Sequence, residues 1–151
     1  MRGKGFKDSE IYLLHEITTR LDRIARDRFL APAGVTYPEF LILMSAHELP
    51  SPTQEEVSAF VDMSKSLVSQ RVSALMKKGL LKQDGDPENR RRVKLRLTDA
   101  GGVEVARIYE AMISSSTKIF DGIGGFRPTF RKALVRMAED LAREEGLARP
   151  R

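Results

Sequence analysis

The side chains of this chain that could do chemistry by type and spacing are Lys and Arg residues gathered in one segment. Residues 64–96 hold ten Lys or Arg and three acidic residues, for a net charge of +7, and the rest of the 151-residue chain has a net charge of −2. A cationic segment this local is the electrostatic footprint of phosphate binding, because Lys and Arg release condensed counterions from a polyanion. A merely solvated basic face is the alternative that composition leaves open.

Catalytic and metal-binding chemistry has few candidate residues. The chain has no Cys, which excludes a disulfide framework, a thiolate metal site, a cysteine nucleophile and a thiol redox sensor. Its two histidines, His15 and His47, match no metal-ligand spacing such as HExxH, and we expect both to be packed or surface residues. The Gly-Ile-Gly-Gly segment at 122–125 is interpreted as a helix break. The sequence therefore predicts no enzyme, no cofactor and no metal site.

The basic residues begin in a predicted helix-turn-helix. Residues 53–56, Thr-Gln-Glu-Glu, form a capping box that starts a short helix. After a break at 62–63, Ser64 can cap a second helix that runs to about residue 78, where Gly79 supplies the left-handed terminator. Two short helices joined by a tight turn, the second of them basic, are typical of a helix-turn-helix.

A predicted β-hairpin follows the second helix. Residues 80–83 are typical of a short strand, and residues 92–97 alternate charged and apolar side chains, as a half-buried strand does. Residues 84–89 between them are rich in turn formers. The return arm begins with Arg90, Arg91 and Arg92, so the order of elements is that of a winged helix with a basic wing.

Amphipathic helices are predicted on both sides of the winged helix. Apolar residues recur at helical spacing over 9 to about 30, over 99–120 and over 128–145, and residues 37–48 predict a short helix buried in the core. The expected fold is mainly α with a small β-hairpin wing, in one unit over 1–151. The flanking helices carry more apolar surface than one winged helix could bury, which predicts a homodimer.

The predicted DNA contacts follow from how a recognition helix enters the major groove, with its N-terminal turns against the base edges. Gln favours adenine and Lys favours guanine. Arg90 and Arg91 could reach the adjacent minor groove, whereas Arg92, Lys94 and Arg96 contact phosphates or remain solvated. The predicted contact set is Lys65, Ser66, Ser69, Gln70, Arg71, Ser73, Arg90, Arg91, Arg92 and Lys94. The alternative is that these are ordinary surface residues.

The wing carries the most specific motif of the sequence. It consists of Asp86-Pro87, Asn89-Arg90-Arg91, Leu95, Leu97-Thr98 and Gly101, within a segment that runs from TQEEVSAFVDMSKSLVSQRVSALMKKGLLKQ at 53–83 to DGDPENRRRVKLRLTDAGG at 84–102. In order and spacing this segment, about a third of the chain, resembles the DNA-binding core of the multiple-antibiotic-resistance-regulator (MarR) family. Two positions depart from the family pattern. Asn89 stands where the family usually has Asp, and Gln70 where it often has a basic residue.

The resemblance implies a homodimer in which the first helix and the last two interlock. It assigns residues 9–31 and 99–145 to dimerisation and residues 37–98 to the winged helix, with the recognition helix at about 64–78 and the wing at about 80–97. Two recognition helices about 34 Å apart would meet successive major grooves of a pseudo-palindromic operator.

The resemblance also implies a transcriptional regulator, usually a repressor, that is released by a small-molecule effector. In the family this effector is often an aromatic acid or phenol. Tyr12, His15, Tyr37, Met44 and His47 are the nearest candidates to line an effector cleft, with core packing as their alternative role.

Three other functions stay open. An effector-independent or architectural DNA-binding protein would discriminate poorly between operator and random DNA. An enzyme or small-molecule carrier that uses the apolar helices would not bind DNA at moderate salt. The winged helix could also bind a protein. The chain shows no long apolar run and no small-residue cleavage site, so we expect a cytoplasmic protein without a membrane partner.

Overall fold

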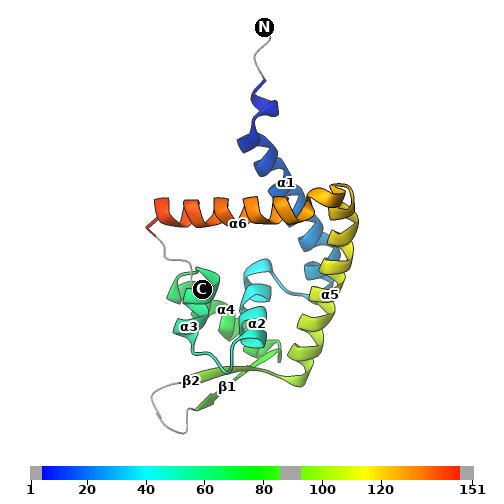
Figure 1. Cartoon of the computed structure of the whole chain (residues 1–151). Helices are drawn as coiled ribbons and strands as arrows, with labels where there is room; N and C mark the ends of the chain where they lie inside the picture. The colour runs from blue at the N-terminus through cyan, green and yellow to red at the C-terminus, as the bar shows by residue number, and fades with distance from the viewer. Residues whose placement is uncertain (1–4, 86–92, 147–151) are drawn as a thin grey trace.

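A computed structural model describes residues 5–85 and 93–146 and shows a mostly helical chain with one small hairpin (Figure 1). The helices are α1 (Glu10–Ala25), α2 (Tyr37–Glu48), α3 (Gln54–Val61), α4 (Lys65–Lys77), α5 (Asp99–Asp121) and α6 (Arg127–Glu144), and the strands are β1 (Leu81–Gly85) and β2 (Val93–Leu97). The long helix α5 leads from the hairpin to α6, and α1 projects beyond α6 on the side away from the hairpin (Figure 1). The predicted fold class is therefore confirmed.

Hydroxyl caps start most of the α-helices. Each cap accepts a hydrogen bond from the backbone N–H three residues on: Thr53 from Glu56 at 3.2 Å, Ser64 from Leu67 at 3.3 Å, and Thr98 at 3.0 Å. The carboxylate of Glu56 also accepts from the Thr53 N–H at 2.7 Å, which completes the predicted capping box. The caps expected from the sequence at Thr53 and Ser64 are confirmed.

The turn of the helix-turn-helix depends on a left-handed residue. Asp62, the C-cap of α3, has φ +52°, and the Met63 N–H donates to the carbonyl of Ser58 at 3.2 Å. The hydroxyl of Ser58 donates in turn to the Met63 carbonyl at 2.5 Å. At the end of α4, Gly79 has φ +70°, the conformation that favours glycine. The predicted break at 62–63 and the predicted terminator at Gly79 are both confirmed.

The hairpin begins and turns later than the sequence suggests. β1 and β2 pair antiparallel in a register that runs from Leu81 opposite Leu97 to Gly85 opposite Val93. Leu80, expected in the strand, instead lies in the turn that follows α4, where its N–H donates to the Leu75 carbonyl at 3.0 Å. Asp84, expected in the turn, is held in the ladder opposite Lys94 and lies 3.3 Å from Arg96. The predicted tip residues Arg90, Arg91 and Arg92 lie outside the described residues.

The core is centred on α2, which the sequence predicts to be buried. Ile42 and Leu43 of α2 are fully buried, and α2 packs against α3, α4, α5 and β2. These neighbours, β1 and the segment after α1 supply further core residues, which are Leu30, Val35, Val57, Val68, Val72, Leu75, Leu81, Leu95, Val105 and Ile108. Within the described chain, α1 buries Ala25 alone and α6 buries no residue.

No single helix in the described residues is long and apolar enough to cross a bilayer. Length and composition together would allow only the bent pair Glu10–Ala33 and Tyr37–Glu48, which meets at 73°.

Gly101 allows α5 to approach the end of the recognition helix closely. A Cβ on Gly101 would lie 1.9 Å from the carbonyl oxygen of Leu80. The Thr98 hydroxyl donates to the Gly79 carbonyl at 2.6 Å, and the Thr98 N–H donates to the Leu80 carbonyl at 3.2 Å. The start of α5 is therefore fixed to the turn that connects α4 to β1.

Candidate nucleic-acid interface

The exposed face of α4 gathers five of the predicted contact residues. Lys65, Ser66, Ser69, Gln70 and Ser73 are all exposed, while the opposite side of α4 packs into the core. The Ser73 hydroxyl donates to the Ser69 carbonyl at 3.0 Å, one turn back along the helix. This face presents amide, hydroxyl and ammonium groups, which can hydrogen-bond base edges and phosphates. We call these five residues the recognition face.

Arg71 lies apart from the recognition face. It is half-buried on the flank of the core side, and its Nε atom is buried without a hydrogen-bond partner among the described residues. A buried N–H without a hydrogen-bond partner costs free energy, so this conformation of the Arg71 side chain is not a favourable one. The DNA contact expected of Arg71 from its charge stays a prediction.

Lys65, the first residue of α4, is paired across the turn of the helix-turn-helix. Its Nζ atom lies 2.5 Å from the Oε1 atom of Glu55 in the first turn of α3, and both side chains are well exposed. The sequence reasoning did not single out Glu55. In a complex with DNA this carboxylate would repel phosphates and compete with them for the Lys65 ammonium.

We expect the Glu55→Gln variant to bind DNA roughly two- to fivefold more tightly than the wild type, because an exposed ion pair contributes little stability and its loss frees Lys65 for phosphate. Titration of a labelled duplex measures this change. Glu110→Gln removes the same charge from an exposed site on α5 and is the matched control. An equal gain in both variants would show a general charge effect and would contradict this role of Glu55.

Strand β2, which belongs to the described part of the wing, contains Lys94 and is hydrogen-bonded to the segment that precedes α3. Lys94 is half-buried in β2 and forms an isolated bridge with Thr53. The Leu95 N–H donates to the Pro52 carbonyl at 2.7 Å. The base of the wing is thus fixed relative to the helix-turn-helix. Contacts by Arg90, Arg91 and Arg92 stay predictions.

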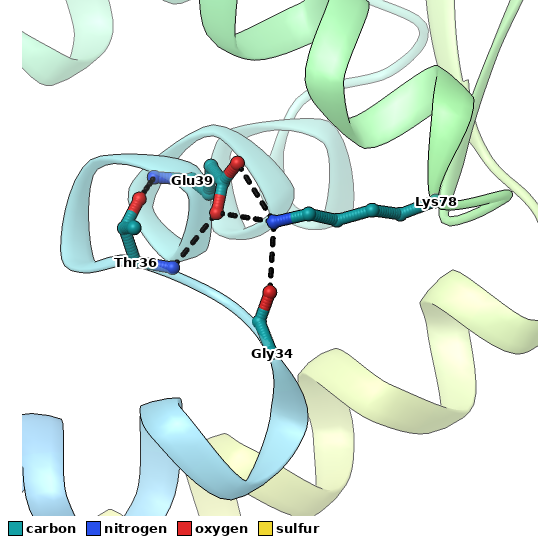
Figure 2. Close-up of polar contacts among 4 residues, drawn as sticks. All are labelled: Gly34, Thr36, Glu39 and Lys78. Carbon is teal, nitrogen blue, oxygen red and sulfur yellow. Dashed lines mark hydrogen bonds and ion pairs between the residues drawn. The ribbon is translucent and has the colours of Figure 1, made fainter.

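An ion pair between a partly exposed lysine and a buried carboxylate connects the end of α4 to the start of α2 (Figure 2). The Nζ atom of Lys78 lies 2.9 and 2.8 Å from the two carboxylate oxygens of Glu39 and donates to the Gly34 carbonyl at 2.7 Å. Glu39 is 2% exposed and also accepts from the Thr36 N–H at 2.8 Å. Burial alone would raise the pKa of Glu39, but the hydrogen bonds from Lys78 and Thr36 outweigh it and lower the pKa. The carboxylate is therefore charged at neutral pH.

Two cavities adjoin the segment that leads into α2. The first, of about 280 Å³, lies between α1 and α5 and has mainly apolar walls that include Leu21, Phe29 and Met112. The second, of about 480 Å³, lies beside the segment that connects α1 to α2. Its walls include Arg26, Ala31 and the 34–37 segment. Asp22 and Tyr37 line both cavities.

The predicted effector residues fall in three separate places. Tyr37 lines the two cavities just described. Met44 and His47 line a hollow of about 160 Å³ between α2 and α5. Tyr12 and His15 line a polar hollow of about 250 Å³ on α1. The described residues include no cluster of three or more His, Cys, Asp or Glu side chains that could hold a metal ion.

A winged helix with an exposed, polar recognition helix defines the class of protein, a helix-turn-helix transcriptional regulator. The MarR family model matches residues 35–93. The chain is 31% identical over 105 residues to the HTH-type transcriptional regulator YdcH of Bacillus subtilis (strain 168), an alignment that covers 67% of this chain and 71% of YdcH. The chain belongs to the MarR family. This family and fold are those of transcriptional regulators and not of enzymes.

Solved structures share this fold over nearly the whole chain. CouR from Rhodococcus jostii RHA1, bound to p-coumaroyl-CoA, is 20% identical with a TM-score of 0.78, covering 93% of this chain and 96% of CouR. The repressor CouR has also been solved on a 23-mer DNA duplex, with 22% identity, a TM-score of 0.75, and 94% and 98% coverage. PcaV from Streptomyces coelicolor, in complex with its natural ligand, is 23% identical with a TM-score of 0.72, covering 94% of this chain and 99% of PcaV.

Proposed function

We propose that this protein is a homodimeric repressor that binds a pseudo-palindromic operator and releases it when a small effector binds. The observation that carries the DNA-binding part is the recognition face, which presents five polar side chains on the solvent side of α4. The net charge of +7 over residues 64–96 supports the same part, because it supplies the phosphate attraction that such a helix needs. The solved complex of CouR with DNA shows that a similar fold can dock on a duplex.

The dimer is supported by apolar faces that one chain leaves uncovered. Leu134, Met137 and Leu141 are spaced along one side of α6 and are 38%, 41% and 61% exposed. Ile17 of α1 and Ile113 of α5 are about half exposed as well. A second copy would bury these faces, since an apolar stripe of this kind is costly in water. We assign residues 9–31 and 99–145 to dimerisation and residues 37–98 to DNA binding.

The effector site is supported by the two cavities that meet at Asp22 and Tyr37. Their walls combine apolar side chains with a few polar groups, which is the usual character of a small-molecule site. The Tyr37 ring suits an aromatic or phenolic effector. The similar proteins CouR and PcaV have been solved with ligands bound, and CouR holds p-coumaroyl-CoA. A ligand releases DNA only if it prefers the conformation that binds DNA poorly.

Arg91→Ala tests the wing assignment that follows from this function. We expect operator binding to weaken about tenfold or more, because an Arg in a groove contributes about 1–3 kcal/mol. Dimerisation and helix content should not change, because the wing does not belong to the dimer helices. Anisotropy titration and circular dichroism measure these two properties. Arg131→Ala on α6 removes the same charge outside the winged helix and should bind as the wild type does; wild-type affinity for Arg91→Ala would make the wing assignment wrong.

A further inference from the structure

The end of the recognition helix is held by a side chain that crosses to another element. Lys78 is the C-cap of α4, and its ammonium makes three hydrogen bonds, two to Glu39 and one to Gly34 (Figure 2). Its backbone N–H donates to the Ala74 carbonyl at 3.0 Å, so Lys78 cannot move without moving the last turn of α4. Lys78 is neither on the recognition face nor in the buried core.

One of the two residues that accept from Lys78, Gly34, lies in the wall of the larger cavity. Gly34, whose carbonyl accepts from Lys78, lines the 480 Å³ cavity together with Thr36 and Tyr37. Gly34 has φ +64°, so the chain turns sharply at this point. The Thr36 N–H is hydrogen-bonded to Glu39, which fixes this wall to the same carboxylate that holds Lys78. One short segment thus faces the cavity on one side and anchors α4 on the other.

Separating Lys78 from Glu39 would cost free energy. Glu39 is almost fully buried and charged, and a buried carboxylate that loses its cationic partner is strongly destabilised. A displacement of the 34–36 segment must therefore move Lys78 with it. Beyond Lys78, the Gly79 carbonyl accepts from Thr98 of α5, so the turn into the wing is tied to the same point.

We propose that Lys78 is the positioning residue of the recognition helix and that the Glu39–Lys78 pair transmits occupancy of the 480 Å³ cavity to α4. This inference rests on the proposed function in that α4 reads DNA and that a small molecule occupies this cavity. An occupant that pushes the 34–37 wall outward shifts the anchor of α4, and the recognition helix then meets the major groove at a changed angle. Through this pair, binding of an effector in the cavity changes the affinity of α4 for DNA, and binding of DNA changes the affinity for the effector.

A substitution that fills the cavity with a larger side chain tests this coupling without the need for an identified effector. Ala31 is exposed, lines the same cavity, and does not contact Lys78 through any hydrogen bond described for the chain. The Ala31→Trp substitution places an indole in the cavity. The uncoupled background is Glu39→Gln combined with Lys78→Met, which removes both charges and so leaves no buried ion unpaired. Lys77→Met removes one exposed charge from the adjacent position and is the control for charge loss.

The readout is the affinity for operator DNA in a double-mutant cycle. We expect Ala31→Trp to weaken binding about tenfold or more in the wild-type and Lys77→Met backgrounds, within the range of known couplings. In the uncoupled background we expect a change below about twofold, since the link is absent there. An equal loss in all three backgrounds, or no loss in any, overturns the proposal.

Hydrogen exchange separates this inference from the proposed function. The amides of Lys78, Gly79 and Leu80 donate within the end of α4, so a displaced anchor should speed their exchange in the absence of DNA. We expect faster exchange in Ala31→Trp than in the wild type, and no such difference between the uncoupled background and its Ala31→Trp derivative. If the wild type fails to bind operator DNA but this exchange pattern is observed, the proposed repressor function is wrong and the proposed coupling between the cavity and α4 is supported. Unchanged exchange in Ala31→Trp overturns the link whatever the DNA result.

Discussion

The Gly101→Ala variant is expected to lose more than about 3 kcal/mol of the free energy of unfolding, a loss large enough to unfold many domains of this size. The added methyl would lie 1.9 Å from the Leu80 carbonyl oxygen and 2.9 Å from its carbon, so the backbone itself must move. That movement would pull the start of α5 from the turn after α4, where Thr98 and Gly79 are hydrogen-bonded. Denaturant unfolding at fixed protein concentration measures the change.

Gly102→Ala is the matched control for this prediction. Gly102 is the next residue of α5, and a Cβ there meets no described atom within 4 Å. Alanine should stabilise the helix at this position by roughly 0.5–1 kcal/mol, since it loses less backbone entropy than glycine. Equal stabilities for the two variants would contradict the close approach of α5 to Leu80.

The Leu134→Glu variant is expected to be monomeric and to bind operator at least about a hundredfold more weakly than the wild type. The carboxylate would lie in the middle of the apolar stripe of α6, where a second copy is proposed to pack. Without the dimer, each recognition helix binds its half-site alone and loses the roughly 10²–10⁴-fold gain that comes from linked sites. Light scattering gives the oligomeric state and anisotropy gives the affinity.

Val103→Glu places the same charge on a residue of α5 that is 69% exposed and close to the hairpin end of the helix. Val103 falls within the 99–145 segment assigned to dimerisation, but it lies near the start of α5, at the end of this helix that follows the hairpin and not at the end that leads to α6. We therefore expect this control to stay dimeric and to keep most of its affinity. A Leu134→Glu protein that remains dimeric and binds operator normally would show that α6 is not part of the interface.

Local features of the fold could be predicted because their causes lie within a few residues. The capping box at Thr53, the cap at Ser64, the break at 62–63 and the terminator at Gly79 depend on neighbours in sequence, and all four are confirmed. The buried character of α2 followed from its composition, since it is apolar on nearly every side.

Features that depend on distant residues could not be predicted. Lys78 and Glu39 are 39 positions apart, and nothing in the spacing of either residue points to the other. Arg71 lies on a flank of α4 where helical periodicity does not decide between burial and exposure, and the structure half-buries it. The exact start of β1 was also missed, although its cause is local: the Leu80 N–H donates to the Leu75 carbonyl five residues back, so Leu80 belongs to the turn after α4.

The candidate site shows the same division. Periodicity placed the recognition face correctly on the solvent side of α4, because the face follows from the helix alone. The five predicted effector residues instead line four hollows in three separate places, since the packing of α1 and α2 against α5 decides which of them meet. Glu55 was missed because its partner Lys65 lies across a turn whose geometry the sequence does not specify.

The recognition face is proposed to read a specific DNA sequence, and one titration tests this proposal most directly. Fluorescence anisotropy of purified protein against the intergenic DNA beside its own gene, compared with a scrambled duplex at roughly physiological salt, measures both affinities. We expect binding to the native fragment to be tighter by about a thousandfold or more, the margin typical of specific regulators. Equal and weak binding to both duplexes, with steep salt dependence, would contradict a sequence-specific repressor of this site and would favour an architectural DNA-binding protein.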